Sequence, residues 1–270
     1  MLRLRYEMLR DVVDVFVLVE ARQTFTGQPK PLHFQEGSDQ LPRDLLARTV
    51  AVSVDLPFNP SLGQGSTWDN EAYQRHATLL AVTERLQPDP RDIILHSDLD
   101  EIYRPSALKA VVRALSDGHQ PHLPAETLVL RFGMTLFYYN LSCILDPNRL
   151  WTKPYGATYA TLVRLSAGIT GEQGTVWPGL VNYVRVNLEV HLLRDVVWLG
   201  GWHLSYFKSL RKIFEKLEAF SHSEVNTEAV RREAASRIER GLSLVHHDKD
   251  QELYCRWGRS GCVGNILATK

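Results

Sequence analysis

Residues 92–101 read Asp-Ile-Ile-Leu-His-Ser-Asp-Leu-Asp-Glu and carry the pattern that decides the fold. Their first half is a short apolar run, typical of a buried strand, that leads directly into three carboxylates. In an open α/β sheet, ligands bind at the carboxyl ends of the strands. Asp98 and Asp100 alternate along an extended segment and therefore point the same way, toward one Mg²⁺ or Mn²⁺ ion. An Asp-x-Asp pattern also occurs by chance in solvated loops, and that alternative stays open.

The sequence on either side alternates between strand-like and helix-like segments. Residues 12–19 and 48–54 are rich in β-branched side chains and are predicted strands. A helix is predicted over residues 69–86, with Asp69 as its N-cap, and another over residues 105–118, which begins with a proline and ends with a glycine. This alternation predicts an α/β fold in which helices cross over between the strands of a parallel sheet.

The second half of the chain has a different pattern. Residues 128–145 are strand-like and rich in aromatic side chains, and residues 181–198 are predicted to form strands or irregular structure. Residues 210–220 place four apolar side chains on one face and are a predicted helix. Asn226 or Thr227 caps a further, polar helix. The chain therefore ends in a helical segment.

Composition excludes several classes of protein. The chain has 270 residues, with 31 basic and 31 acidic side chains, which argues against nucleic-acid binding through bulk charge. Its hydrophobic content of 44 % is that of a globular protein. No transmembrane segment or signal peptide is visible, so we expect a cytoplasmic protein without a membrane partner. Three cysteines, Cys143, Cys255 and Cys262, imply no disulfide framework and are expected to be reduced.

Two further groups contain residues capable of chemistry. In the segment 200–207 (GGWHLSYF), the glycines allow close approach to a ligand and His203 suits a metal, although a turn into an aromatic core explains the segment equally simply. His222 and Glu224 follow the predicted helix 210–220 and form either an active-site pair or a polar helix end. Residues 246–248 (HHD) resemble metal ligands only in composition and are expected at the surface.

Glu71 and Arg75 are one helical turn apart on the predicted helix 69–86. An i,i+4 ion pair on the helix face is the simple explanation for this spacing. The alternative is that Arg75 reaches a diphosphate, because a guanidinium pairs well with phosphate oxygens.

Five separated blocks of sequence occur in the order found in one known family. They are Val19-Glu20 with residues 24–32 (TFTGQPKPL), Trp68 with Glu71, Gln74 and Arg75, residues 94–102 (ILHSDLDEI), residues 201–207 (GWHLSYF) and residues 220–224 (FSHSE). Together they resemble glycosyltransferase family 17, over about residues 2–244.

The resemblance implies a GT-A-like α/β fold with a mixed, mostly parallel central sheet flanked by helices. It implies one domain with a nucleotide-binding half (1–125), an acceptor-side half (126–207) and C-terminal helices (208–270). It also implies a UDP-sugar donor, UDP-GlcNAc in characterised members, a glycan acceptor, inversion at the anomeric carbon, and Mn²⁺ or Mg²⁺. The metal ligands would be Asp98, Asp100 and His203.

Candidate residues can be named for the single-displacement mechanism that the resemblance implies. The catalytic candidates are Asp98, Asp100, Glu101, Glu172 and Glu224, of which the three glutamates are candidates for the general base. The donor-binding candidates are Glu20, Thr26, Arg75, Asp98 and Trp202. Trp177, Trp202 and Tyr206 are candidates for stacking on sugar rings, although core packing explains any single aromatic as well.

The sequence departs from the family in one respect. Family members begin with another strand before the block that matches residues 5–19, so we expect this chain to lack the first strand of the nucleotide-binding sheet and to expose a sheet edge. That departure keeps open a non-catalytic protein that binds a nucleotide sugar or a glycan. A glycoside hydrolase is the other alternative, although Asp98 and Asp100 lie too close in sequence to flank a glycosidic bond easily.

Overall fold

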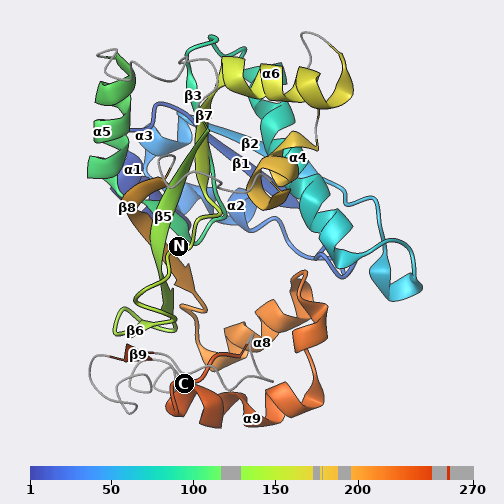
Figure 1. The fold of residues 1–270 in the computed structure, drawn as a ribbon. Coiled ribbons are helices and arrows are strands. Elements are labelled where there is room, and N and C mark those ends of the chain that lie inside the picture. The colour runs from blue at the N-terminus through green and yellow to red at the C-terminus, as the bar shows by residue number, and fades with distance from the viewer. Residues whose placement is uncertain (117–128, 173–176, 178, 188–195, 245–253, 256–270) are drawn as a thin grey trace.

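The computed structural model describes residues 1–116, 129–172, 177, 179–187, 196–244 and 254–255. An α/β body forms most of the molecule, and the two long strands β5 (Val129–Tyr138) and β8 (Val196–Ser205) run from it toward a C-terminal group of helices (Figure 1). That group contains α8 (Leu210–Ala219) and α9 (Glu228–Glu239). Both helices predicted after residue 208 are therefore present among the described residues, and the described residues 254–255 form a strand.

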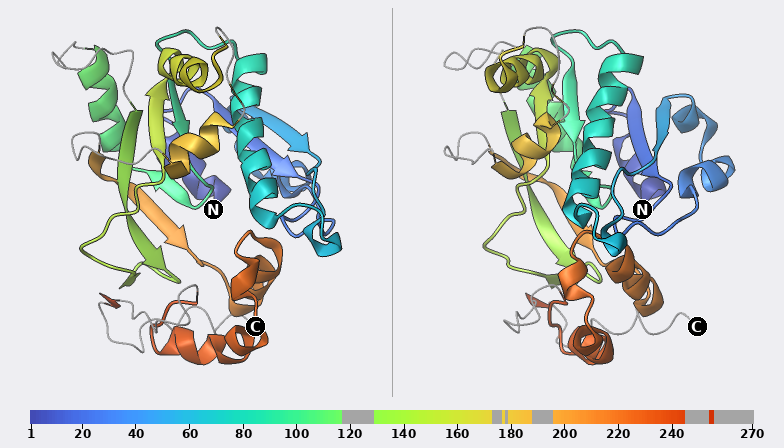
Figure 2. Two further views of the ribbon diagram at one scale, coloured as in Figure 1. Left: turned by 45° about the vertical axis from the view of Figure 1, so that its right-hand side comes forward. Right: turned by 90° about the vertical axis from the view of Figure 1, so that its right-hand side faces the viewer.

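The body contains two sheets, which lie on either side of the long helix α4 (Thr67–Arg85) in both views of Figure 2. The smaller sheet pairs β1 (Phe16–Ala21) with β2 (Thr49–Val54) in parallel. The larger sheet has the order β3-β7-β5-β6-β9, with β8 pairing β5 and β4. Its other strands are β3 (Ile93–His96), β4 (Glu101–Tyr103), β6 (Cys143–Ile144), β7 (Tyr155–Thr158) and β9 (Tyr254–Cys255).

The prediction of a mostly parallel sheet is wrong. Among the strand pairs that the structure describes in the larger sheet, only β5–β8 is parallel. The pairs β3–β7, β4–β8, β5–β7, β5–β6 and β6–β9 are antiparallel. The helix α4 does cross from β2 toward β3, as the alternation of elements indicates. Strand β3, however, pairs with β7 and not with a strand of the smaller sheet. The fold is therefore mixed α/β.

The remaining helices cover the body. They are α1 (Leu2–Leu9), α2 (His33–Gly37), α3 (Arg43–Leu46), α5 (Pro105–Ser116), α6 (Tyr159–Thr170) and α7 (Leu180–Asn182). Shorter helical turns cover Ser38–Gln40, Pro60–Leu62 and Ser223–Val225, and a π-helical turn covers Tyr183–Asn187. No helix among the described residues is both long and apolar enough to cross a membrane.

Several predicted boundaries change in the structure. The N-cap of α4 is Ser66 and not Asp69: the Ser66 hydroxyl accepts from the Asp69 amide, and the Asp69 carboxylate accepts from the Ser66 amide. This reciprocal pair is a capping box, which explains why an acidic residue lies at the third position of the helix. Strand β1 begins only at Phe16, four residues later than predicted.

Residues 180–187 are helical, which corrects the prediction of strands or irregular structure over 181–198. The buried side chains Leu180, Val181 and Val184 follow a helical spacing and pack against Leu79 of α4 and Leu162 of α6. The valines favoured a strand prediction, but the spacing of the buried positions is that of a helix. Strand β8 occupies only the end of the predicted region and continues to Ser205.

The glycine pair Gly200-Gly201 lies inside β8 and not in a turn, which corrects the simpler reading of that segment. A Cβ atom on Gly201 would overlap the carbonyl oxygen of Ile102 on the neighbouring strand β4. Glycine is therefore required for the close packing of β8 against β4. The packing sets the register that places His203 opposite Glu101.

Cys143 is disulfide-bonded, which corrects the expectation of reduced thiols. Its strand β6 pairs with β9, and the register places Cys143 opposite Cys255. The sequence separation of these cysteines is large, and only the folded topology brings their backbones together.

Candidate functional site

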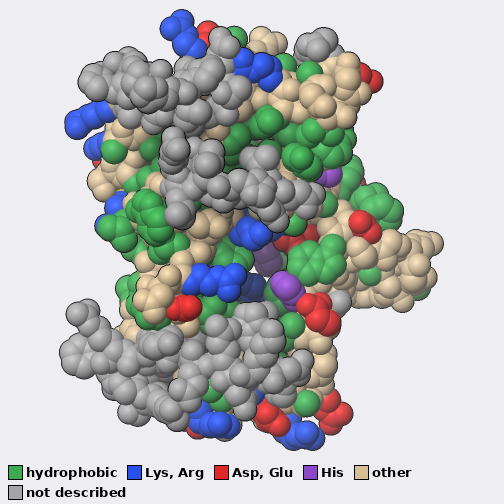
Figure 3. All heavy atoms as spheres, in the orientation of Figure 1, with side chains coloured by type: hydrophobic (Ala, Val, Ile, Leu, Met, Phe, Trp, Pro, Cys, Tyr) green, Lys and Arg blue, Asp and Glu red, His purple; other side chains and the backbone are tan. Residues whose placement is uncertain are grey.

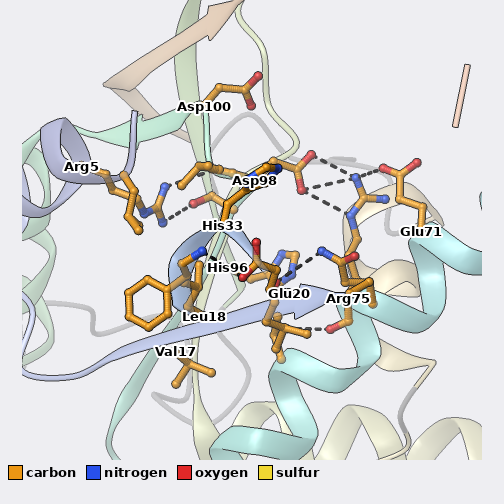
Figure 4. Close-up of a pocket in the computed structure, with 18 of the residues that line it drawn as sticks. Arg5, Val17, Leu18, Glu20, His33, Glu71, Arg75, His96, Asp98 and Asp100 are labelled. Carbon is orange, nitrogen blue, oxygen red and sulfur yellow. Dashed lines mark hydrogen bonds and ion pairs between the residues drawn. The ribbon is translucent and has the colours of Figure 1, made fainter. Parts of the chain in front are cut away.

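A cavity of about 640 Å³ lies between β1, the start of α4 and the segment that follows β3 (Figure 4). All six residues of β1 line it. Because successive residues of a strand face opposite sides, a cavity lined by every residue lies along the edge of the strand and not over one face. The free edge of β1 is therefore one wall of the cavity.

Backbone groups are available along this edge. Phe16 and Arg22 donate their amides to Arg48 and Val54 on the β2 side, so that the even-numbered residues of β1 face β2. In a parallel ladder the intervening residues, Val17, Val19 and Ala21, direct their amide and carbonyl groups the other way. The Val19 carbonyl accepts from Gln74 Nε2 at 3.4 Å. The wall thus offers backbone donors and acceptors to a ligand.

Asp98 is held by two arginines at the carboxyl end of β3. Its Oδ2 atom lies 3.0 Å from an Arg75 nitrogen and 2.7 Å from an Arg185 nitrogen. Burial alone would raise the pKa of the Asp98 carboxyl, but attraction to Arg185 and Arg75 outweighs it and lowers the pKa to about 2. Asp98 therefore remains ionised, with two guanidinium groups as its partners.

Arg75 also pairs with Glu71, as the simpler interpretation of the Glu71–Arg75 spacing predicts. The i,i+4 ion pair is present, and Arg75 additionally reaches across to Asp98. Both Glu71 and Arg75 line the cavity. The Oε2 atom of Glu71 is buried without a hydrogen-bond partner. The arginine is thus placed on the cavity wall by two carboxylates.

Glu101 lies beneath this pair and is fully buried. Its carboxylate receives Arg185 at 2.6 and 3.0 Å, Trp151 Nε1 at 2.5 Å and the Asp98 amide at 2.7 Å. Both oxygens are therefore occupied, which fits a structural anchor and not a general base. The prediction that Glu101 is a base has no support in this geometry.

Arg5 of α1 holds the backbone of the same segment. Its guanidinium donates to the carbonyls of Asp98, at 3.2 Å, and Glu101, at 2.6 Å, and to Ser97 Oγ at 2.6 Å. Arg5 lines the cavity beside Ser97 and Asp98. The conformation of residues 97–101 therefore depends on a helix that is more than ninety positions away in sequence.

Asp100 faces a different set of partners. Lys216 Nζ of α8 lies 3.4 Å from its Oδ2 atom, and His203 Nε2 of β8 lies 3.7 Å from its Oδ1 atom. Burial opposes ionisation, but the neighbouring His203 imidazole and the charge of Lys216 hold the pKa of Asp100 well below its usual range. Basic, acidic and histidine side chains gather where the body meets the C-terminal helices (Figure 3).

The predicted metal ligands do not form a metal site as they stand. His203 and Asp100 are neighbours, but Asp98 is directed to Arg75 and Arg185. Among the described residues, no three His, Cys, Asp or Glu side chains are grouped so that they could hold a metal ion. Mg²⁺ and Mn²⁺, however, are usually bound through one or two carboxylates together with substrate phosphates. In this arrangement side-chain cations occupy both aspartates, so a metal ion would have to displace Arg75 and Arg185 from Asp98 or Lys216 from Asp100.

The predicted donor-binding residues divide into two groups. Glu20 and Arg75 line the cavity, with Glu20 accepting from the Phe34 amide at 3.0 Å. Thr26 instead donates to the Glu218 carbonyl at 3.1 Å and joins its loop to α8. Trp202 lies under the guanidinium of Arg104, 4.6 Å from the ring centroid. Thr26 and Trp202 are not among the residues that line this cavity.

Among the remaining candidates, only Glu224 has a partner suited to catalysis. Its carboxylate lies 2.6 Å from His222 Nδ1. Glu172 is exposed just after α6, and its amide donates to Thr170. Trp177 packs in the core against Tyr183, and Tyr206 is buried against Lys216. Residues 246–248 lie outside the described residues.

Sequence reasoning missed Arg5, Arg185 and His96. Arg185 is 3 % exposed and lies in the π-helical turn, in a segment whose other buried side chains are apolar. A lone arginine in an apolar run signals a buried charge that needs a partner, and this was the available clue. His96 lines the cavity, stacks on Tyr155 and has a buried Nδ1 without a hydrogen-bond partner.

His96 leads to a prediction about acid stability. Burial, with Arg185 nearby, lowers the pKa of His96 from 6.5 to about 3. The unfolded chain takes up this proton below pH 6.5 and the folded protein does not, so stability is lost as the pH falls from 6.5 toward 3. We expect a loss of about 5 kcal/mol from this group across that range.

The measurement compares wild type with His96→Phe, which keeps a ring against Tyr155. Urea unfolding at pH 7, 5 and 4 should show a shallower loss of stability in the variant, because the other titrating groups are common to both proteins. Identical pH dependence in the two proteins would contradict the prediction.

Comparison with known proteins agrees with the residues that form this site. A family model for glycosyltransferase family 17 matches residues 1–140, just over half of the chain. The chain belongs to glycosyltransferase family 17. The match includes the family 17 blocks at residues 19–32, 68–75 and 94–102, which contribute Arg75, Asp98 and Asp100 to the site.

Two relatives of this family 17 chain carry the same descriptive name. They are the human and rat proteins called β-1,4-mannosyl-glycoprotein 4-β-N-acetylglucosaminyltransferase, from Homo sapiens and Rattus norvegicus. Each is 32 % identical over 103 residues, which is 38 % of this chain and 19 % of the relative. The match thus spans about a fifth of the length of these curated relatives. No solved structure matches the chain.

Proposed function

We propose that this family 17 protein transfers a sugar from a nucleotide-sugar donor, GlcNAc from UDP-GlcNAc, to a hydroxyl of a glycan acceptor with inversion at the anomeric carbon. The observation that carries the proposal is the cavity in which the Asp98–Asp100 segment, Arg75 and the edge of β1 meet. Its volume of about 640 Å³ falls within the range of small-molecule sites. The names of the human and rat relatives support the choice of GlcNAc.

The two ends of the cavity suit the two ends of the donor. Along β1, backbone groups of Val17 to Ala21 and the side chain of Glu20 offer hydrogen bonds of the kind that a nucleoside makes. At the other end, Arg75 of α4 and Lys216 of α8 line the cavity beside Asp98 and Asp100. Guanidinium and ammonium groups are the side chains that bind phosphates in proteins. We therefore place the diphosphate between Arg75 and Lys216.

In the reaction, the acceptor oxygen attacks the anomeric carbon from the face opposite the diphosphate. The bond from that carbon to the diphosphate oxygen breaks, and the electron pair leaves on UDP. Arg75 and Lys216 oppose the negative charge that grows on the leaving group, and such fixed charges are worth about 100- to 1,000-fold in rate. Asp98 and Asp100 hold these two cations in place.

The binding of donor is the first prediction of this function. UDP and UDP-GlcNAc should raise the melting temperature of wild type, because a ligand of the folded state stabilises it by mass action. GDP-mannose should give a smaller shift. Arg75→Met should weaken UDP binding by at least about 10-fold through loss of a charge-assisted contact. Arg211→Met on the exposed face of α8, where Arg211 is 88 % exposed, is the matched control.

The assay for transfer measures UDP release from UDP-GlcNAc, with para-nitrophenyl β-mannoside as the acceptor. Formation of the disaccharide product would support a transferase. Donor binding without any UDP release would instead support the non-catalytic alternative. No binding of any of the nucleotide sugars would contradict the proposal.

A further inference from the structure

His222 and Glu224 form a hydrogen-bonded pair that has no part in the roles proposed above for Arg75 and Lys216. His222 Nδ1 lies 2.6 Å from Glu224 Oε1, and the two side chains are 40 % and 61 % exposed. Burial would raise the pKa of the Glu224 carboxyl, but its hydrogen bond to His222 outweighs that effect and lowers the pKa. An ionised carboxylate at Nδ1 favours the tautomer that carries its proton there. The lone pair then lies on Nε2, which is able to accept a proton.

Trp68 provides an apolar surface next to this pair. The Trp68 ring, which belongs to the first turn of α4, meets the His222 ring edge to face, with centroids 4.5 Å apart. Trp68 is 46 % exposed, and Phe220 also contacts the histidine, with the ring centroids 5.4 Å apart. An exposed indole beside a histidine offers a flat surface of the kind that packs against the C–H face of a sugar ring.

The pair adjoins the cavity. Phe220 and Ser221, the two residues immediately before His222, line the cavity together with Lys216. The Ser221 carbonyl accepts from Thr67 Oγ1 at 2.7 Å, which joins the end of α8 to the start of α4. His222 therefore follows directly from the cavity wall that carries Lys216, the partner of Asp100.

We infer that His222 is the general base that deprotonates the acceptor hydroxyl, that Glu224 positions its imidazole, and that Trp68 carries the acceptor sugar. This inference rests on the proposed transferase function and completes its proton balance. The acceptor oxygen bonds to the anomeric carbon, the diphosphate leaves with the electron pair, and the acceptor proton passes to His222 Nε2 and then to solvent. Removing a general base typically costs about 100- to 10,000-fold in rate.

The rings packed against His222 carry no charge. From α4 it meets Trp68 and from the end of α8 it meets Phe220. Lys216 also lies near Phe220, with its Nζ 6.0 Å from the ring centroid. Glu224 is the carboxylate that pairs with His222. A general base acts only in its unprotonated form, so the rate should fall on the acid side, and this acid limb should disappear when the imidazole is removed.

The experiment measures kcat/KM for UDP release from UDP-GlcNAc between pH 5 and 9, with para-nitrophenyl β-mannoside or with water alone as the acceptor. His222→Gln should lower the rate at least about 100-fold and abolish the acid limb. His222→Ala should regain rate when free imidazole is added. Glu224→Gln should lower kcat more than it changes KM for UDP-GlcNAc, because the imidazole loses the carboxylate that orients it. His76→Gln on α4 and Glu215→Gln on α8 are the matched controls and should leave the profile unchanged.

UDP binding by these variants separates this inference from the proposed function. A His222→Gln protein that binds UDP like wild type but turns over slowly, without the acid limb, supports the base. A His222→Gln protein with the wild-type rate or pH profile would overturn the inference that His222 is the general base, and the proposed transferase function would still stand. Wild type that neither binds UDP-GlcNAc nor releases UDP would overturn both.

Discussion

Arg185→Met should destabilise the folded protein by about 3–5 kcal/mol, because it leaves the buried Glu101 carboxylate without its cation. Glu101 is fully buried and Arg185 is 3 % exposed, so solvent cannot replace the lost partner. The guanidinium contacts Glu101 at 2.6 and 3.0 Å and Asp98 at 2.7 Å, a bidentate arrangement that a lysine cannot reproduce. Arg185→Lys should therefore recover only part of the loss.

Urea unfolding of both variants measures this loss, and a double-mutant cycle with Glu101→Gln isolates the pair. The double variant should lose less than the two single variants together, since neither charge is then left alone. The control is Arg211→Met, which removes an exposed ion pair with Glu215 and should cost less than about 1 kcal/mol. A cost of under 1 kcal/mol for Arg185→Met would show that the buried pair does not hold the segment in place.

Local sequence patterns located most of the elements but not the partners of the strands. The apolar run before Ser97 predicts β3, and the capping signals and apolar face predict α4 and α8, all of which the structure contains. Strand pairing depends on contacts far apart in sequence, and the alternation of strands and helices suggested parallel neighbours that β3 does not have. The helix over 180–187 was missed because its valines favour a strand. The helical spacing of its buried residues was the weaker signal.

The candidate site divides in the same way. Asp98, Asp100, Arg75 and Glu20 were predicted from local motifs, and the structure brings all four to one cavity. Arg185 reaches Asp98 across 87 positions, and no local pattern encodes that contact. The sequence indicated His222 and Glu224 as either an active-site pair or a polar helix end, and the structure shows the two side chains 2.6 Å apart, a contact that both interpretations allow.

Asp98→Asn and Asp100→Asn should each lower UDP release from UDP-GlcNAc by at least about 100-fold, the scale expected when a charge at the leaving group is misplaced. Asp98 positions Arg75 and Arg185, whereas Asp100 positions Lys216 and His203. The stability of the two variants should differ, because Asp98 is a partner of a buried arginine and Asp100 is not. Circular dichroism and urea unfolding check that both variants remain folded.

The same two variants test whether side-chain cations or a divalent metal hold the diphosphate. The ion pairs of Asp98 and Asp100 predict that wild type binds UDP in the presence of EDTA and that Arg75→Met loses this binding. They also predict that Asp98→Asn still binds UDP without metal, because removing the carboxylate leaves Arg75 available for phosphate. If Asp98 and Asp100 are instead metal ligands, as the family 17 resemblance implies, wild type should bind UDP only with Mn²⁺. Both variants should then lose that binding. UDP titrations in the presence of Mn²⁺ and in the presence of EDTA distinguish these two modes of diphosphate binding. Only in the metal-dependent mode do the aspartates contact the donor, through the bound ion.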